Sequence, residues 1–232
     1  LARKAEKEDW DHVRYLRNLC ELELSERAGR RVQRRLKQAG LPDGKTMETL
    51  DQGQLPLKVR RQIPRLIEGD FVERAENVLV FGLPGRGKTH LVSANGRELI
   101  VQRDRRVVFR KTFQLVQQLL AAKRELRLES VLRKLDRVDV VVLDDIGYVQ
   151  QDREEMEVLF TFLSERYERR SVMITSNLVF SEWGRIFKDP MTTAAAIDRL
   201  VHHSTILELD NESFRAKQAH NRQEGRKGNE DK

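Results

Sequence analysis

Cysteine is almost absent from this sequence, which has a single one, Cys20, in 232 residues. One cysteine cannot form an internal disulfide, so a disulfide-stabilised secreted scaffold is excluded. The composition instead suits a reducing compartment such as the cytoplasm. Because Leu19 and Leu22 lie close to it along the chain, we expect Cys20 to be a small buried apolar residue.

Long apolar runs are also missing, since no stretch approaches the roughly 18 residues that cross a membrane. No segment has the apolar core of a secretory signal, so we expect no membrane partner. The five histidines and one cysteine do not occur at the spacings of a zinc cluster. His202 and His203 are adjacent, at the end of a predicted helix over 191–203. Adjacent helical side chains point in different directions, so no metal is expected there.

Charge is abundant, and its balance is basic. The chain has 44 Lys and Arg against 37 Asp and Glu, which gives a net charge of +7. This charge favours an acidic partner, of which nucleic acid is the first candidate. The segment 27–37 holds six basic residues and no acidic one. These residues are Arg27, Arg30, Arg31, Arg34, Arg35 and Lys37. A second basic run comprises Lys58, Arg60, Arg61 and Arg65.

On a helix, steps of three and four residues would group the arginines of 27–37 along one broad stripe. Contact with the phosphate backbone of DNA needs such a stripe. No aromatic residues are interleaved, which argues against single-strand stacking as the main mode of binding. The alternative is a solvated helix face that pairs with Glu21, Glu23 and Glu26.

The N-terminal region, residues 1–54, is predicted to be helical and to end in a linker. Apolar residues at helical spacing indicate a helix over 9–38, which Gly29 could divide into two. Glycine and proline then mark 42–54 as a linker. A further helix is predicted over 57–67.

Residues 55–219 alternate strand and helix signals, which favours an α/β fold with a parallel sheet between helices. Strands are expected at 78–81, 107–110, 138–143, 172–175 and 206–209. The helices are expected at 88–102, 112–122, 153–169, 181–187 and 191–203, with Thr112 and Ser181 as N-caps. The tail 220–232 is polar and is predicted to be disordered.

The stretch GLPGRGKT fits the phosphate-loop pattern G-x-x-x-x-G-K-[ST] in full. Its glycines let successive N–H groups point at a phosphate, and the following helix adds its positive end. Lys88 should neutralise the β- and γ-phosphates of ATP, and the Thr89 hydroxyl should bind Mg²⁺. The predicted nucleotide-binding residues are Gly82, Leu83, Pro84, Gly85, Arg86, Gly87, Lys88 and Thr89.

Two further strands end in polar residues at the same predicted edge of the sheet. The strand over 138–143 leads into Asp144, which should hold Mg²⁺, and Asp145, which should polarise the attacking water. The alternative for this pair is a strand-end turn with capping aspartates. The strand over 172–175 leads into Ser-Asn, so Asn177 could sense the γ-phosphate; an ordinary turn explains that pair equally well.

Four stretches together resemble one family: VLVFGLPGRGKTHL, LDDIGY, ITSN and FSEWGRIFKDPMTTAAAIDRLVHHS. The chain resembles the IstB-type ATP-binding helper proteins of insertion-sequence transposons, from the N-terminal helices to about residue 219. The resemblance implies an AAA+ fold related to DnaC-like helicase loaders. It also implies ATP and Mg²⁺ as cofactors, homo-oligomers assembled on double-stranded DNA, and a transposase partner.

The same resemblance assigns further roles. Arg199 falls where related proteins place the arginine finger that reaches a neighbouring subunit's ATP, although a surface charge or an intrahelical pair would also explain it. Arg215 is a poorer candidate for a second sensing arginine. Two departures, Arg86 before the last loop glycine and Asp145 in place of glutamate, put the hydrolysis rate in doubt more than ATP binding.

The resulting prediction is an ATPase that assists a transposase on double-stranded DNA. A helicase loader with the same ATPase domain is the nearest alternative. A third hypothesis is a DNA-binding scaffold that uses the nucleotide as a structural ligand with little turnover. A small-molecule kinase is a distant alternative, because no acceptor-binding lid is apparent and the basic stripe would have no role.

Overall fold

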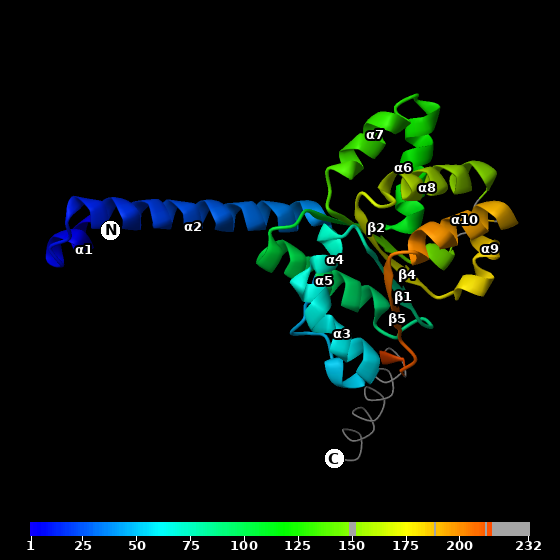
Figure 1. Cartoon of the computed structure of the whole chain (residues 1–232), viewed down its shortest axis with the longest axis horizontal. Helices are drawn as coiled ribbons and strands as arrows, with labels where there is room; N and C mark the ends of the chain where they lie inside the picture. Colours follow the sequence, from blue (N-terminus) through cyan, green and yellow to red (C-terminus); the bar gives the residue numbers. More distant parts are fainter. Residues whose placement is uncertain (149–151, 188, 212, 215–232) are drawn as a thin grey trace, which may run out of the picture.

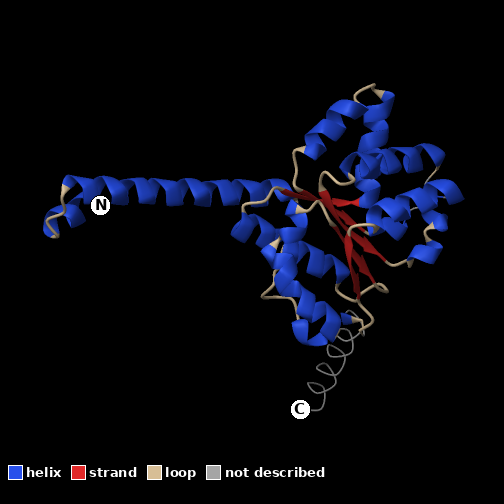
Figure 2. Cartoon of the chain, in the orientation of Figure 1, coloured by secondary structure: helices blue, strands red, loops and turns tan. Residues whose placement is uncertain are grey.

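Five parallel strands form the central sheet of the computed structural model, which describes residues 1–148, 152–187, 189–211 and 213–214. The strands are β1 (Asn77–Phe81), β2 (Val107–Lys111), β3 (Val140–Asp144), β4 (Ser171–Ser176) and β5 (Ser204–Glu208). They lie in the order β2-β3-β4-β1-β5, and each neighbouring pair is parallel. Helices cover both faces (Figures 1 and 2). The predicted α/β fold with a parallel sheet between helices is confirmed.

Successive residues of each strand face two separate cores, as the two-residue period of a strand requires. The helices are α1 (Ala2–Lys7), α2 (His12–Ala39), α3 (Leu57–Glu68), α4 (Asp70–Glu73), α5 (Lys88–Arg103), α6 (Thr112–Arg124), α7 (Leu128–Asp136), α8 (Arg153–Arg166), α9 (Gly184–Phe187) and α10 (Pro190–Val201). Val140 and Val142 pack on the side of α5, whereas Val141 and Leu143 pack on the side of α6 and α8. Short 3-10 turns occupy Gln52–Gln54, Ile146–Tyr148 and Phe180–Glu182. Both faces of β1, β3 and β4 are therefore buried.

Several predicted helix boundaries were wrong. Helix α7 was not expected, although its apolar residues have the spacing of an amphipathic helix and pack against the core beside α6 and α8. Helix α10 ends at Val201 rather than His203, and α8 ends at Arg166 rather than Arg169. Ser181 lies inside the turn Phe180–Glu182 and does not cap a helix. The Thr112 hydroxyl is not a cap either, because it donates to the Asp144 carbonyl oxygen over 3.1 Å.

Arg166 fixes the amino-terminal edge of the sheet. Its guanidinium is buried and donates to the carbonyl oxygens of Leu135, Val138, Asp139 and Ser171 at 2.8–3.1 Å. Burial lowers the pKa of Arg166 to about 10, so the group still carries its charge at neutral pH. These bonds join the end of α7 to the starts of β3 and β4.

Helix α2 runs unbroken through Gly29, and its first half extends away from the body of the molecule (Figure 1). Val32 and Leu36, near its C-terminal end, pack against the core beside α5. Cys20 lies on the extended half and is exposed, so its predicted burial was wrong. No described helix is both long and apolar enough to cross a bilayer. The predicted boundary at residue 54 stays a prediction, as does the tail 220–232, which lies outside the described residues.

Candidate nucleotide-binding site

The loop between β1 and α5 has a backbone that only glycine adopts without strain at three positions. Gly82, Gly85 and Gly87 have φ angles of +151°, +83° and +92°. A Cβ atom at Gly82 would lie 2.5 Å from the Leu209 carbonyl oxygen, so a side chain there would clash with backbone. The glycines of the pattern are therefore required by both the turn and the close approach of the chain after β5.

Lys88 begins α5 and is almost completely buried. Its ammonium donates to the carbonyl oxygens of Gly82, over 2.6 Å, and Leu83, over 3.1 Å. The side chain thus curls over the loop that would surround a phosphate. A phosphate oxygen is charged and makes a stronger hydrogen bond to ammonium than a carbonyl does, so a bound nucleotide would compete well for this group.

Thr89 and Asp144 lie in direct contact across the base of the loop. The Thr89 hydroxyl donates to Asp144 Oδ1 over 2.9 Å, and Asp144 is buried at the end of β3. A hydroxyl and a carboxylate side by side, next to a phosphate loop, are the oxygen ligands that Mg²⁺ prefers. The residues therefore fit a nucleotide-bound magnesium ion, as the sequence predicts.

Thr175 is a site residue that the sequence pattern alone did not single out. Its buried hydroxyl donates to Asp144 Oδ1 and accepts from the Asp145 N–H, both over 2.8 Å. Asp145 has a φ of +65°, a left-handed conformation that aspartate tolerates better than most residues. One hydroxyl on β4 thus holds both the Asp144 carboxylate and the Asp145 main chain at the end of β3. Its place in β4, beside β3, depends on strand order and not on local sequence.

We expect Thr175→Val to lower the free energy of unfolding by about 1–3 kcal/mol, because the Asp145 N–H would be left without its acceptor. Urea denaturation without nucleotide measures this. Thr175→Ser, which keeps the hydroxyl, is the matched control and should stay closer to the wild type. Equal stability of the valine variant and the wild type would show that the hydroxyl does not hold the two aspartates.

A cavity of about 690 Å³ opens above these residues. It is lined by residues of the loop and of the strand ends that follow, including Lys88, Thr89, Asp145, Thr175 and Asn177. Asn177 follows β4, and its Oδ1 atom is buried with no hydrogen-bond partner among the described residues. The structure therefore brings Asn177 and Asp145 to the same cavity as the phosphate loop. Their catalytic roles remain predictions.

The segment before α3 forms the opposite wall of this cavity. Gly44, Lys45, Thr49, Leu50, Asp51 and Gln54 line it. His90 joins this wall to α5, because its Nε2 lies 3.0 Å from the Thr46 carbonyl oxygen and 3.1 Å from the Thr49 hydroxyl. Desolvation lowers the pKa of His90, so the imidazole is neutral at pH 7. The segment predicted as a linker is thus part of the nucleotide site, which a composition of glycine and proline could not indicate.

The chain after β5 lies against the phosphate loop. Arg86 Nη1 donates to the Leu209 carbonyl oxygen over 3.1 Å, and the Phe214 N–H donates to the Gly85 carbonyl oxygen over 3.0 Å. The Phe214 ring would be 3.1 Å from a Cβ atom at Gly87. The Arg86 side chain thus binds the chain after β5, and its contact with a nucleotide stays a prediction. Arg215 lies outside the described residues.

Arg199 lies on α10, and it is not among the residues that line the cavity. Its guanidinium lies 4.7 Å from the centroid of the Phe160 ring, and Nη1 is buried with no hydrogen-bond partner among the described residues. The guanidinium thus packs on Phe160 and does not reach the cavity of its own chain, and a role in trans stays a prediction.

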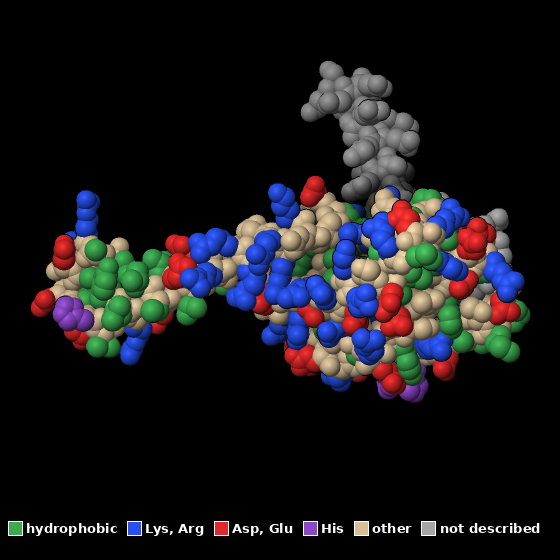
Figure 3. All heavy atoms as spheres, turned by 90° about the horizontal axis from the view of Figure 1, so that it is seen from above, with side chains coloured by type: hydrophobic (Ala, Val, Ile, Leu, Met, Phe, Trp, Pro, Cys, Tyr) green, Lys and Arg blue, Asp and Glu red, His purple; other side chains and the backbone are tan. Residues whose placement is uncertain are grey.

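The arginines of segment 27–37 take part in several ion pairs, and those of Arg27, Arg30 and Arg31 are exposed. Arg27 and Arg30 contact Glu23, and Arg31 and the largely buried Arg35 contact Asp104. Exposed pairs of this kind are weak, so phosphate could displace the acids. Figure 3 shows Lys and Arg side chains along the half of α2 nearer the body and green hydrophobic side chains over its far half. Arg34 and Lys37 are exposed on the same half.

A phosphate loop after the first strand of a parallel sheet ordered β2-β3-β4-β1-β5, with carboxylates after β3, defines a P-loop nucleotide-binding protein with the AAA+ fold. The family model described as IstB-like ATP binding protein matches residues 1–222. The chain belongs to this family of ATP-binding proteins.

Two relatives of this chain are ATP-binding proteins of insertion sequences. An insertion sequence ATP-binding protein of Sinorhizobium fredii is 47% identical over 220 residues, covering 94% of this chain and 74% of the relative. The ATP-binding protein of insertion sequence IS21 from Pseudomonas aeruginosa is 40% identical over 218 residues, covering 94% of this chain and 82% of the relative. The predicted resemblance to the IstB type is confirmed.

Two solved structures with the same fold are the DnaC helicase loader and DnaA. The DnaC helicase loader superposes with a TM-score of 0.58 at 18% identity, covering 66% of this chain and 89% of that chain. AMPPCP-bound DnaA from Aquifex aeolicus superposes with a TM-score of 0.62 at 17% identity, covering 76% of this chain and 53% of that chain. At such identity the likeness shows the AAA+ fold alone, and the predicted fold is confirmed.

Proposed function

We propose that this chain is a Mg²⁺-dependent ATPase that assembles on double-stranded DNA and assists a partner transposase. One observation carries the enzymatic part: Lys88, Thr89, Asp145 and Asn177 line one cavity, with Asp144 bonded to Thr89 at its base. The names of the relatives, ATP-binding proteins of insertion sequences, support the part concerning transposition. We place the protein in the cytoplasm, where the DNA of an insertion sequence lies.

The residues of the cavity have different roles in phosphoryl transfer. The loop N–H groups and Lys88 bind the β- and γ-phosphates, and the positive end of α5 adds to that attraction. Thr89 and Asp144 would hold the magnesium ion, which would neutralise charge on the phosphates. Asp145 orients and polarises the attacking water, and the Asn177 amide contacts that water or the γ-phosphate.

Contact with DNA is assigned to the basic face of α2, which we define as Arg27, Arg30, Arg31, Arg34, Arg35 and Lys37. Arg35 differs from the others because only 16% of its side chain is exposed and it binds both the backbone carbonyl and the carboxylate of Asp104. It therefore also holds α2 against the end of α5. The exposed members of the face are the better phosphate ligands.

Neutralising about six phosphates per protomer should give a log–log salt slope of roughly −5 for DNA binding. Changing Arg27, Arg30, Arg31 and Arg34 together to alanine, while Arg35 is kept, should reduce the slope to roughly −2 and weaken all DNA sequences alike. Fluorescence anisotropy over a range of salt concentrations measures both effects.

The control removes the same charge elsewhere. Arg124, Arg127, Arg133 and Arg169 are exposed residues on or beside α6, α7 and α8, and their joint change to alanine should leave the slope near that of the wild type. An unchanged slope in the α2 variant would show that the basic face does not bind DNA and is a solvated surface that pairs with Glu23, Glu26 and Asp104.

The nature of the partner separates the proposal from its nearest alternative, a helicase loader. Purified chain, with ATP and double-stranded DNA, should retain the transposase encoded beside it on the element and not the replicative helicase of the host. Retention of the helicase alone would favour the loader. ATP-dependent DNA binding with no measurable phosphate release would favour a scaffold in which the nucleotide is a structural ligand.

A further inference from the structure

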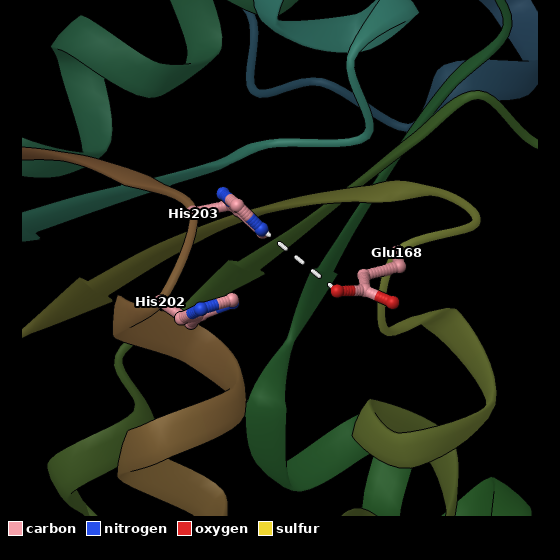
Figure 4. Close-up of side chains that lie close together, drawn as sticks. All are labelled: Glu168, His202 and His203. Atoms are coloured by element: carbon pink, nitrogen blue, oxygen red, sulfur yellow. Dashed lines mark ion pairs between the residues drawn. The ribbon is translucent and has the colours of Figure 1, made fainter.

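Three side chains of metal-ligand type gather at the edge of the sheet opposite to the nucleotide cavity. Glu168, His202 and His203 each place one ligand atom within 4.8 Å of the other two. Figure 4 shows His203 directed toward the Glu168 carboxylate, with the His202 ring beside them. In the described part of the chain, no other group of three His, Cys, Asp or Glu side chains meets this geometry.

The sheet topology brings these residues together. Glu168 lies in the turn before β4, and the two histidines lie between α10 and β5. Because β4 and β5 both pair with β1 in parallel, the turns that precede them lie at the same edge. The Asn77 N–H at the start of β1 donates to the His203 carbonyl oxygen over 2.8 Å, and Glu168 has a left-handed φ of +55°. Main-chain geometry therefore holds both segments in place.

No metal was expected at the two histidines because the predicted helix over 191–203 includes both. Helix α10 ends at Val201, so His203 is outside the helix and the divergence of adjacent helical side chains does not apply. The two imidazole rings instead lie with centroids 4.1 Å apart. That expectation rested on a wrong helix boundary.

The arrangement provides two imidazoles and one carboxylate, a donor set that suits zinc and related transition metals rather than Mg²⁺. His203 Nε2 lies 3.8 Å from Glu168 Oε1, and ligands around a tetrahedral zinc ion lie roughly 3.3 Å apart. All three side chains are exposed, so small rotations can close the difference.

Tyr167 provides an outer contact of the kind that orients metal-binding histidines. Its hydroxyl lies 3.2 Å from His202 Nδ1. When Nδ1–H donates to the Tyr167 oxygen, the Nε2 lone pair of His202 is left available for a metal. Water would complete the coordination of a three-ligand site.

We propose that Glu168, His202 and His203 form a binding site for a divalent transition metal of the zinc class. The ion joins the turn before β4 to the turn before β5 and fixes the C-terminal end of α10, the helix that carries Arg199. The site is separate from the nucleotide cavity, and the proposal does not depend on ATP hydrolysis or on DNA binding.

Calorimetric titration of the EDTA-treated full chain with zinc chloride, in excess Mg²⁺, tests the proposal. The titration uses a Cys20→Ser background, because the exposed Cys20 thiol is a competing zinc ligand. We expect one zinc ion per chain and a rise in melting temperature on saturation. Cobalt(II) at the same site should give the visible absorption of a tetrahedral ion. No saturable binding below about 100 µM zinc would overturn the proposal.

Variants locate the site. His203→Ala and Glu168→Gln should each weaken zinc binding by at least tenfold, and Tyr167→Phe should weaken it by about 10–100-fold, as loss of an outer partner typically does. His12→Ala, at an exposed histidine on α2, is the matched control and should bind zinc like the parent. Melting temperatures without metal verify that each variant folds. Parent-like zinc affinity in folded His203→Ala and Glu168→Gln would place the metal elsewhere and refute the site.

Discussion

A mixture of Arg199→Ala and Asp145→Asn proteins should hydrolyse ATP far faster than either variant alone. The first variant keeps an intact phosphate loop and Asp145 but lacks the arginine, and the second keeps the arginine but cannot polarise water. If Arg199 reaches the ATP of a neighbouring protomer, their contact completes one working site. Arginine fingers of this kind contribute about 10³–10⁵ in rate, so the recovery should be large.

The physical reason is electrostatic. Charge spreads over the γ-phosphoryl oxygens in the transition state, and a fixed guanidinium stabilises it there. Within its own chain Arg199 lies against Phe160 and is not among the residues that line the cavity. A protomer in isolation would therefore lack this cation, and turnover should rise more than linearly with protein concentration and again with double-stranded DNA.

The double variant Arg199→Ala/Asp145→Asn provides the control, because mixing it with Arg199→Ala supplies no arginine and should restore nothing. Crosslinking verifies that the variants co-assemble, and ATP affinity of Arg199→Ala should stay near that of the wild type. Co-assembled mixtures with no recovery of phosphate release would refute a finger in trans and leave Arg199 as a packing residue on α10.

Two substitutions in the cavity should separate ATP binding from ATP hydrolysis. Lys88→Ala should abolish ATP binding, because it removes the cation that neutralises the β- and γ-phosphates. Asp145→Asn should keep ATP affinity while turnover falls by about 10²–10⁴, the usual contribution of a general base. Filter binding and phosphate release measure the two quantities independently.

Asp145→Glu is the informative companion, since it restores a carboxylate that is one methylene longer. It should retain turnover if a carboxylate at this position acts on the water. Wild-type hydrolysis by Asp145→Asn would remove Asp145 from the base role, and the Asp144–Thr89 contact at 2.9 Å would then remain as a metal site without an adjacent base.

The strands and the phosphate loop were predictable from sequence because their signals are local. Apolar runs such as 140–143, rich in valine, indicate buried parallel strands, and GLPGRGKT specifies a backbone that only glycine adopts at three positions without strain. The identification of the family likewise depended on contiguous stretches of sequence. The helix boundaries were predicted less accurately, because the ends of α8 and α10 depend on where the chain must turn back to the sheet.

Local sequence alone specifies two separate sets of groups: the phosphate loop with its lysine and threonine, and the pair of aspartates at the end of β3. The fold brings these two sets together, with Thr89 and Asp144 in contact although 55 residues separate them, and adds further distant groups. Strand order placed the Thr175 hydroxyl beside Asp144 and Asp145, and the fold made residues 44–54 a wall of the cavity through His90. Parallel pairing of β4 and β5 with β1 likewise brought Glu168 to His203. These contacts span tens of residues, and no periodicity or local pattern encodes them, because they depend on which strands become neighbours.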